Sequence, residues 1–284
     1  MSRTWGPTIE AHVGEQTTVH YRSELGKHIF AADLDTSLHG GVSERYRDTP
    51  VTSMHLHGGV TPTAVRRQPG TADAAAPCTS LFEFPNRQEA GHLWYHDHAM
   101  AITRANVYAG LAGGMYFLRD DHDTGRPDNP LGLPAGEYEI PLILQEKIFR
   151  DDGHQSLRST PVVPQGMWEG GGAVGDRGLV NGKVWPRTAV DRGLYRFRLI
   201  NAASFSVWRL FFSNRMRFWV IGNEGGLLSA PVATRSFEAA PGERFDLLVD
   251  FSSLAPGETV DLCNDMVPPF QALMLGEVAM TRFC

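Results

Sequence analysis

Two short histidine-rich segments place the strongest constraint on the fold of this chain. The first is residues 54–59, MHLHGG, and the second is residues 94–98, WYHDH. Residues two apart in an extended strand face the same side, so each segment would present its two imidazoles together. If the two strands are neighbours in one β-sandwich, four imidazoles converge on a small volume. These four belong to His55, His57, His96 and His98.

Four converging imidazoles form a candidate metal site. Neutral imidazoles without nearby carboxylates suit copper, zinc, iron or nickel rather than calcium or magnesium. One His-x-His pair arises easily by chance, whereas two pairs in strand-like runs are harder to dismiss. Asp97 stands between two of the histidines and would point to the opposite face of its strand. We therefore interpret Asp97 as a supporting residue rather than a ligand.

The rest of the chain consists of short apolar runs separated by turn residues, including 30 glycines and 18 prolines. Such runs predict an all-β chain of β-sandwiches. We expect strands near residues 17–21, 81–84, 93–96, 114–119, 195–200, 208–212, 218–221 and 245–251. Alternating apolar and basic residues at 195–200 are typical of a half-buried strand. Pro141 suggests that residues 138–145 form an edge strand.

The length of 284 residues suggests about two domains. Residues 120–130 are polar and rich in turn formers, which indicates a connecting segment. We predict a first domain at 1–125 that carries the histidine pairs, a linker at 126–135 and a second domain at 136–284. All eleven histidines lie at or before His154. The second domain therefore supplies almost no imidazole, and we interpret it as a scaffold or spacer without histidine ligands.

Composition excludes several classes of partner and site. The net charge of −6 argues against nucleic-acid binding, and no run of eighteen apolar residues could cross a membrane. The first residues lack the apolar core of a secretory signal, which favours a cytoplasmic location unless the true N-terminus is missing. Cys78, Cys263 and Cys284 do not form a disulfide framework. We interpret Cys78 and Cys263 as buried thiols or loop residues.

Longer stretches around the histidines resemble the multicopper oxidases, particularly the bacterial spore-coat laccase, bilirubin oxidase and phenoxazinone synthase branch. Residues 55–62 resemble the first copper motif of that family, and residues 94–104, continued by 106–113, resemble the second. Residues 179–186, 195–201 and 225–228 resemble the family's second domain. The resemblance implies two cupredoxin-like Greek-key β-sandwiches, with the first clipped at its N-terminus.

The resemblance also implies a function and a set of ligands. A laccase-like multicopper oxidase oxidises phenol- or aminophenol-type donors and reduces dioxygen to water. By resemblance, His55 would hold the type 2 copper, and His57 and His96 would hold one copper of the type 3 pair. His98 would hold the other type 3 copper.

A complete centre in this family needs eight histidines and a type 1 copper cysteine, and the resemblance assigns the missing parts to a third domain. We therefore expect an incomplete chain with half the trinuclear ligands and no type 1 site. The alternatives are an inactive copper- or zinc-binding remnant and one half of a split oxidase. In the latter, a partner chain carries the third domain, or a homo-oligomer supplies further histidines. A cupin-type site is disfavoured because no glutamate follows the first pair at 60–65.

Other residues near the motifs carry weaker expectations. Arg66 falls where related laccases have an acidic residue associated with proton delivery, and an arginine stays charged at neutral pH. His92 falls where a small hydroxyl residue is common, and we expect it at the surface. We expect the remaining histidines to be surface or loop residues, namely His12, His20, His28, His39, His122 and His154.

Overall fold

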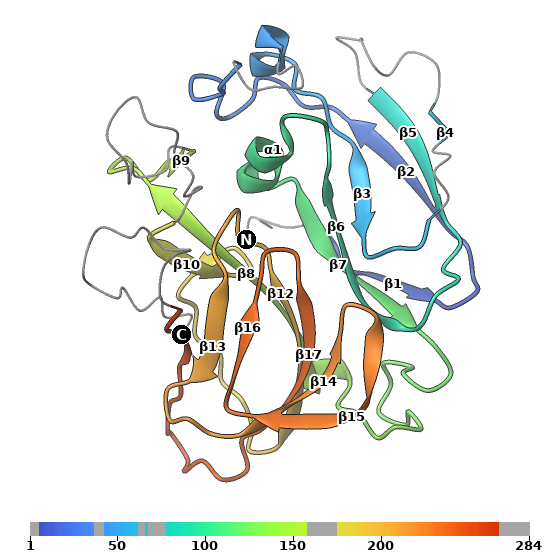
Figure 1. Ribbon diagram of the computed structural model, residues 1–284, viewed down its shortest axis with the longest axis vertical. Coiled ribbons are helices and arrows are strands. Elements are labelled where there is room, and N and C mark those ends of the chain that lie inside the picture. Colours follow the sequence, from blue (N-terminus) through green and yellow to red (C-terminus); the bar gives the residue numbers. More distant parts are fainter. Residues whose placement is uncertain (1–5, 37–42, 62–65, 68–77, 158–174, 267–284) are drawn as a thin grey trace. The chain divides into compact units, whose positions relative to one another are not determined.

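The computed structural model describes residues 6–36, 43–61, 66–67, 78–157 and 175–266, and these are organised mainly as β-sheet (Figure 1). The chain forms two compact units, which divide between Asp120 and Asp121. The all-β prediction is confirmed. The predicted boundaries at 125, 126–135 and 136 remain predictions. Within the described residues, no helix combines the length and the apolar character needed to cross a membrane.

The described residues of the first unit form two sheets. The order β1-β7-β6-β3 combines Ile9–His12, Ala112–Arg119, Gly91–Asp97 and Met54–His57, and the order β2-β5-β4 combines Thr17–Ser23, Cys78–Phe84 and Arg66–Arg67. Two short helices, η1 (Glu44–Arg47) and α1 (Thr103–Ala109), accompany them. The helix α1 ends at Gly110, whose φ of 113° is readily adopted by glycine.

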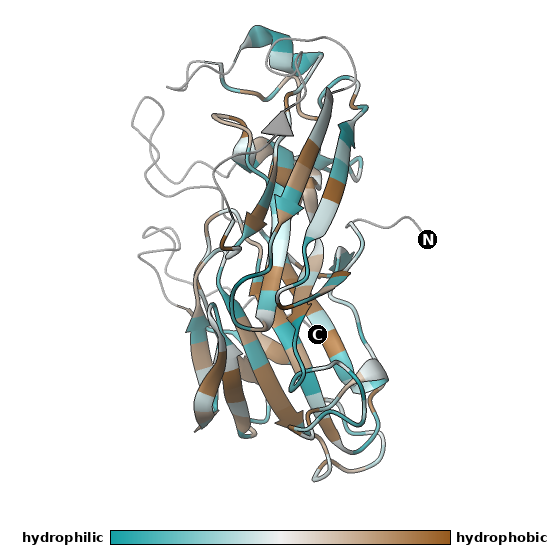
Figure 2. Ribbon diagram, turned by 90° about the vertical axis from the view of Figure 1, so that its right-hand side faces the viewer, coloured by the Kyte–Doolittle hydropathy of each residue, from teal (hydrophilic) through white to brown (hydrophobic). Residues whose placement is uncertain are grey.

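Alternating side chains of these strands build the core of the first unit. In β3, Met54 and Leu56 are buried, and they pack with Leu93, Tyr116 and Leu118. Along the strands of the chain, hydrophobic and hydrophilic bands alternate (Figure 2). Because Met54 and Leu56 take the core side of β3, the intervening His55 and the following His57 must face the other way.

The second unit has a large sheet in the order β11-β10-β8-β12-β17-β14-β15 and a smaller one in the order β16-β13-β18. The strands of the large sheet are Lys183–Val184, Arg177–Val180, Glu139–Phe149, Leu194–Asn201, Arg244–Asp250, Phe218–Asn223 and Gly226–Thr234. Those of the smaller sheet are Ser236–Ala239, Trp208–Phe212 and Leu262–Asn264. A short strand, β9 (Gln155–Ser156), pairs with β8. The helix η2 (Gly136–Tyr138) directly precedes β8. Trp208, Phe197 and Leu199 lie in the core of this unit.

The expectation of an edge strand around Pro141 is wrong for the strand as a whole. The strand β8 lies between β10 and β12. However, β10 pairs only with residues 144–147 of β8, and Pro141 pairs with Arg198 of β12 on the other side. The proline thus occupies the half of β8 that has a neighbouring strand on one side only. On the other side there is no strand to which a backbone N–H at this position would donate.

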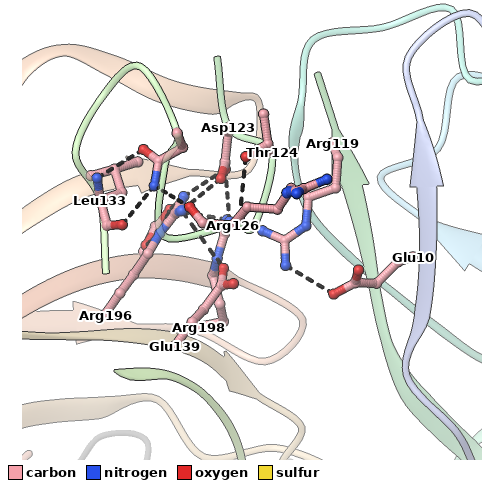
Figure 3. A network of polar contacts seen from close by, with 11 residues as sticks. Glu10, Arg119, Asp123, Thr124, Arg126, Leu133, Glu139, Arg196 and Arg198 are labelled. Carbon is pink, nitrogen blue, oxygen red and sulfur yellow. Dashed lines mark hydrogen bonds and ion pairs between the residues drawn. The ribbon is translucent and has the colours of Figure 1, made fainter. Parts of the chain in front are cut away.

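The strand at 195–200 is buried on both faces, not half-buried. Tyr195, Phe197 and Leu199 enter the apolar core, while Arg196 and Arg198 on the opposite face are also buried. Figure 3 shows these two guanidinium groups converging with the carboxylates of Asp123 and Glu139. Burial of the arginines is tolerated because each is paired with carboxylates.

The distances in this ion cluster are short. Arg196 Nη2 lies 2.7 Å from Asp123 Oδ2 and 2.6 Å from Asp246 Oδ2. Arg198 Nε lies 2.8 Å from Glu139 Oε1, and its Nη2 lies 2.8 Å from Asp123 Oδ2. Asp123 comes from the polar segment after residue 120, so these ion pairs tie that segment to β12.

Candidate metal centre

The strands β3 and β6 bring the two histidine segments together. They are antiparallel neighbours in a register that places His55 opposite His96 and His57 opposite Trp94. Residues directly opposite in such a pair share one face of the sheet. The imidazoles of His55, His57 and His96 therefore gather on the face that the core does not use.

The three imidazoles form a compact set of ligand atoms. One nitrogen from each of His55, His57 and His96 lies within 4.8 Å of the other two. His57 Nδ1 is 3.2 Å from His96 Nε2. His98 follows the last residue of β6 and is not in this set, but its ring centroid is 4.9 Å from that of His55 and 5.7 Å from that of His96.

Hydrogen bonding leaves one nitrogen of His96 ready to bind a metal. Its Nδ1 lies 2.7 Å from the carbonyl oxygen of Asp97, so Nδ1 carries the proton and donates. The Nε2 lone pair then faces His57. Burial, with smaller contributions from the nearby His55 and His98, lowers the pKa of His96 to about 4, although the hydrogen bond to the Asp97 carbonyl opposes this shift. Burial and then His98 also lower the pKa of His55. Neutral imidazoles are the form that a metal requires.

Trp94 covers one side of the cluster. Its indole stacks on His57 with ring centroids 5.3 Å apart and lies in a tilted contact with His96, with centroids 4.3 Å apart. Trp94 is buried. The sequence alone did not single out this contact, because it depends on the register that puts Trp94 opposite His57.

The carboxylate of Asp97 is held by backbone and amide donors, which fits its interpretation as a supporting residue. Its carboxylate accepts hydrogen bonds from the backbone N–H of Ser53 at 2.7 Å and of Ala99 at 3.0 Å. Asn106 Nδ2 donates a third at 2.8 Å. Burial raises the pKa of Asp97, and these three donors oppose that rise.

Two histidines outside the cluster, His28 and His92, are buried. His28 is enclosed, with its Nε2 3.1 Å from Asn106 Oδ1. His92 packs against Phe117 with ring centroids 5.7 Å apart. The surface expectation for His92 was wrong, because the sequence does not show which segments cover a strand. His28 lies in a loop, which the expectation of a surface or loop residue allowed. His12 is half-buried, His20, His122 and His154 are exposed, and His39 lies outside the described residues.

The remaining predicted positions are partly described. The buried thiol predicted at Cys263 is confirmed. The side chain of Cys78 and all of Cys284 lie outside the described residues, as does the side chain of Arg66. The backbone of Arg66 belongs to β4 and pairs with Leu81 of β5.

Comparison with known proteins gives a consistent set of relatives, although no family model matches the chain. A laccase from Bacillus stratosphericus is 39% identical over 271 residues, covering 87% of this chain and 49% of the relative. Multicopper oxidase LPR1 from Arabidopsis thaliana is 39% identical over 286 residues, covering 93% and 46%. The chain thus spans about half the length of the curated relatives that it matches.

Solved structures agree with this result. The McoA multicopper oxidase from Aquifex aeolicus superposes with a TM-score of 0.75 at 27% identity, covering 98% of this chain and 54% of that one. A laccase from Pediococcus acidilactici gives a TM-score of 0.70 at 27% identity, covering 92% and 49%.

Proposed function

Because this chain belongs to the multicopper oxidase family, we propose that it is the part of a laccase-like oxidase that carries half of the trinuclear copper ligands. The fold is the expected one, with cupredoxin-like β-sandwiches. The proposed reaction is the oxidation of phenol- or aminophenol-type donors coupled to the reduction of dioxygen to water. The observation that carries the proposal is the set of three imidazoles from two paired strands.

The donor set fits copper. Among the described residues the cluster consists of imidazoles alone, which suits copper better than the hard cations calcium and magnesium. The low pKa of His96 and the proton on its Nδ1 keep Nε2 available at neutral pH. When bound, copper supplies the one-electron redox chemistry that protein side chains lack. The role of this chain is to hold and orient the imidazoles and to cover them with the indole of Trp94.

The proposed assignment gives His55 to the type 2 copper, His57 and His96 to one type 3 copper, and His98 to the other. The separation of 3.2 Å between His57 Nδ1 and His96 Nε2 supports a shared ion. His57 and His96 would therefore hold one ion between them.

The other ligands would come from a third cupredoxin domain, either in the same polypeptide or on a partner chain. A second copy of this chain could also bring further imidazoles, but not a type 1 site. Dioxygen and a small organic electron donor are the proposed substrates.

The experiment is copper analysis of the chain after anaerobic loading with Cu(I), followed by an absorption spectrum in air. We expect copper to bind to the wild-type chain and to be lost in a variant with His55→Gln and His96→Gln. His20→Gln is the matched control, because His20 is an exposed histidine on β2 of the same unit. Equal copper in all three proteins would refute the assignment.

Oxidase activity requires a second measurement, with the third domain supplied. Oxygen uptake with a phenol and the near-ultraviolet band of a coupled type 3 pair would support the oxidase. Copper binding without either result, in the presence of that domain, would contradict the oxidase and favour an inactive metal-binding protein.

The set of three imidazoles alone also suits one zinc ion. Competition between zinc and Cu(I) in the same titration distinguishes the two metals.

A further inference from the structure

We propose that Asn106 is a positioning residue for the metal centre, oriented by His28 and acting through Asp97 on both histidine segments. This inference rests on the proposed function, because it concerns the geometry of the copper ligands. Asn106 itself touches none of the four histidines in the motifs. Its effect would pass through the three hydrogen bonds that the Asp97 carboxylate accepts, from Asn106, Ser53 and Ala99.

Asn106 lies at the centre of a buried polar network. It belongs to α1 and is fully buried. Its Nδ2 donates to Asp97 Oδ2 at 2.8 Å and to the carbonyl oxygen of Val51 at 2.9 Å. Its Oδ1 is 3.1 Å from His28 Nε2. One amide group therefore joins the helix, the end of β6, the chain leading into β3 and the segment around His28.

Asp97 passes this constraint to both histidine segments. The N–H of Ser53, two residues before His55, donates to one carboxylate oxygen, and the N–H of Ala99, directly after His98, donates to the other. The N–H of His98 also donates to the carbonyl oxygen of Ser53 at 2.7 Å. Bonds to a charged carboxylate are stronger than those between neutral groups. The start of β3 and the end of β6 are thus fixed to the same group.

His28 determines which way the amide of Asn106 faces. The N–H of Phe30 donates to His28 Nδ1 at 3.0 Å, so Nδ1 must accept and the proton is assigned to Nε2. Nε2–H can then donate only to an oxygen, which places Oδ1 of Asn106 toward His28 and Nδ2 toward Asp97. Phe30 also packs on Tyr108 of α1, with ring centroids 5.7 Å apart. This contact holds the His28 segment against the helix.

Such a network matters because metal ligands tolerate little displacement. Productive geometry requires ligands within about 0.5 Å and 10–20° of their positions. Loss of outer hydrogen-bond partners of metal ligands typically costs about 10–100-fold in metal affinity. We expect a loss of this size when Asn106 can no longer hold Asp97.

The test compares Asn106→Ala with Asn86→Ala in the full 284-residue chain. Asn86 is a matched control because it is a second buried asparagine of the first unit. It donates to the Glu15 carbonyl at 2.7 Å and accepts from the Tyr116 hydroxyl at 2.9 Å. Both variants should lower the melting temperature of the copper-free chain. Only Asn106→Ala should weaken Cu(I) binding by about 10–100-fold in competition with a chromogenic chelator.

A second pair of variants keeps the test valid if Asn106→Ala does not fold. Glutamine at position 28 can still donate to Asn106 Oδ1, whereas leucine cannot. We therefore expect His28→Leu to weaken Cu(I) binding and His28→Gln to restore most of it.

The possible outcomes separate the two proposals. Unchanged Cu(I) affinity in Asn106→Ala, or in His28→Leu if Asn106→Ala does not fold, would overturn the positioning role while leaving the copper site intact. An equal loss in Asn86→Ala would also overturn it, because the effect would then follow stability alone. A wild-type chain that binds no Cu(I) would overturn the proposed function and this inference with it.

Discussion

Removal of Arg196 should destabilise the second unit more than removal of Asp123, although the two side chains bond to each other. The buried cluster contains two arginines and three carboxylates. Arg196→Met leaves three buried carboxylates facing one cation, whereas Asp123→Asn leaves two cations facing two carboxylates. Burial by itself lowers the pKa of Arg196, but the ion pairs with Asp246 and Asp123 outweigh this and hold the pKa above its ordinary value. The guanidinium is therefore charged in the folded state.

The magnitudes follow from the burial of the cluster. Breaking a buried pair by removing one partner costs about 3–5 kcal/mol, which we expect for Arg196→Met. Asp123→Asn loses charged hydrogen bonds but relieves the excess of negative charge, so we expect about 1.5–3 kcal/mol.

Urea unfolding combined with hydrogen exchange of the β12 amides would report the free energy of unfolding of this unit. Arg192→Met is a suitable control, because Arg192 is an exposed arginine at the start of the same region. If Asp123→Asn is as costly as Arg196→Met, the reasoning from charge balance is wrong.

Three further predictions concern pH and packing. Burial raises the pKa of Glu146 to about 7, so its contribution to stability is present below its unfolded pKa near 4.5 and is lost as the pH rises through 7. In the wild-type chain, the unfolding free energy should fall by about 3 kcal/mol between pH 5 and 8. In Glu146→Gln this fall should be absent. Trp94→Ala should lower the free energy of unfolding by about 3–5 kcal/mol, since it removes a buried indole, and Trp94→Phe should cost less. The pKa of about 4 for His96 predicts that protons compete with copper at this ligand only below about pH 5, measurable by Cu(I) titration.

Each of these has a contrary outcome. An unchanged pH profile in Glu146→Gln would show that another group titrates. Equal costs for Trp94→Ala and Trp94→Phe would show that ring stacking is unimportant. Loss of copper between pH 6 and 7 would contradict a neutral His96.

The sequence was sufficient to predict that the histidine segments are strands and that their imidazoles share a face. The alternation of Met54 and Leu56 with His55 and His57 carries that information, because burial of one set exposes the other. The exact register was not predictable, and it is the register that brings Trp94 onto His57. Nothing local distinguishes a register shifted by two residues.

Polar contacts between residues far apart in the chain could not be predicted from the sequence either. His28 and Asn106 are 78 positions apart, and neither has a neighbouring residue that marks it as buried. Arg196 and Arg198 resembled the solvent face of a strand, because their partners come from three separate segments. A buried charge can be recognised only together with the charges that neutralise it.

The contacts of Asn106 set a minimum size for any engineered copy of this site. A designer who grafts only β3 and β6 onto another sheet would transfer the imidazoles without the helix and the loop that hold Asp97. The shortest segment that retains the hydrogen bonds described for Asn106 and Asp97 runs from His28 to Leu111, whose carbonyl oxygen accepts from the backbone N–H of Asp97 at 2.8 Å. The histidine pairs are thus not a portable motif of two strands but one part of a module of more than eighty residues.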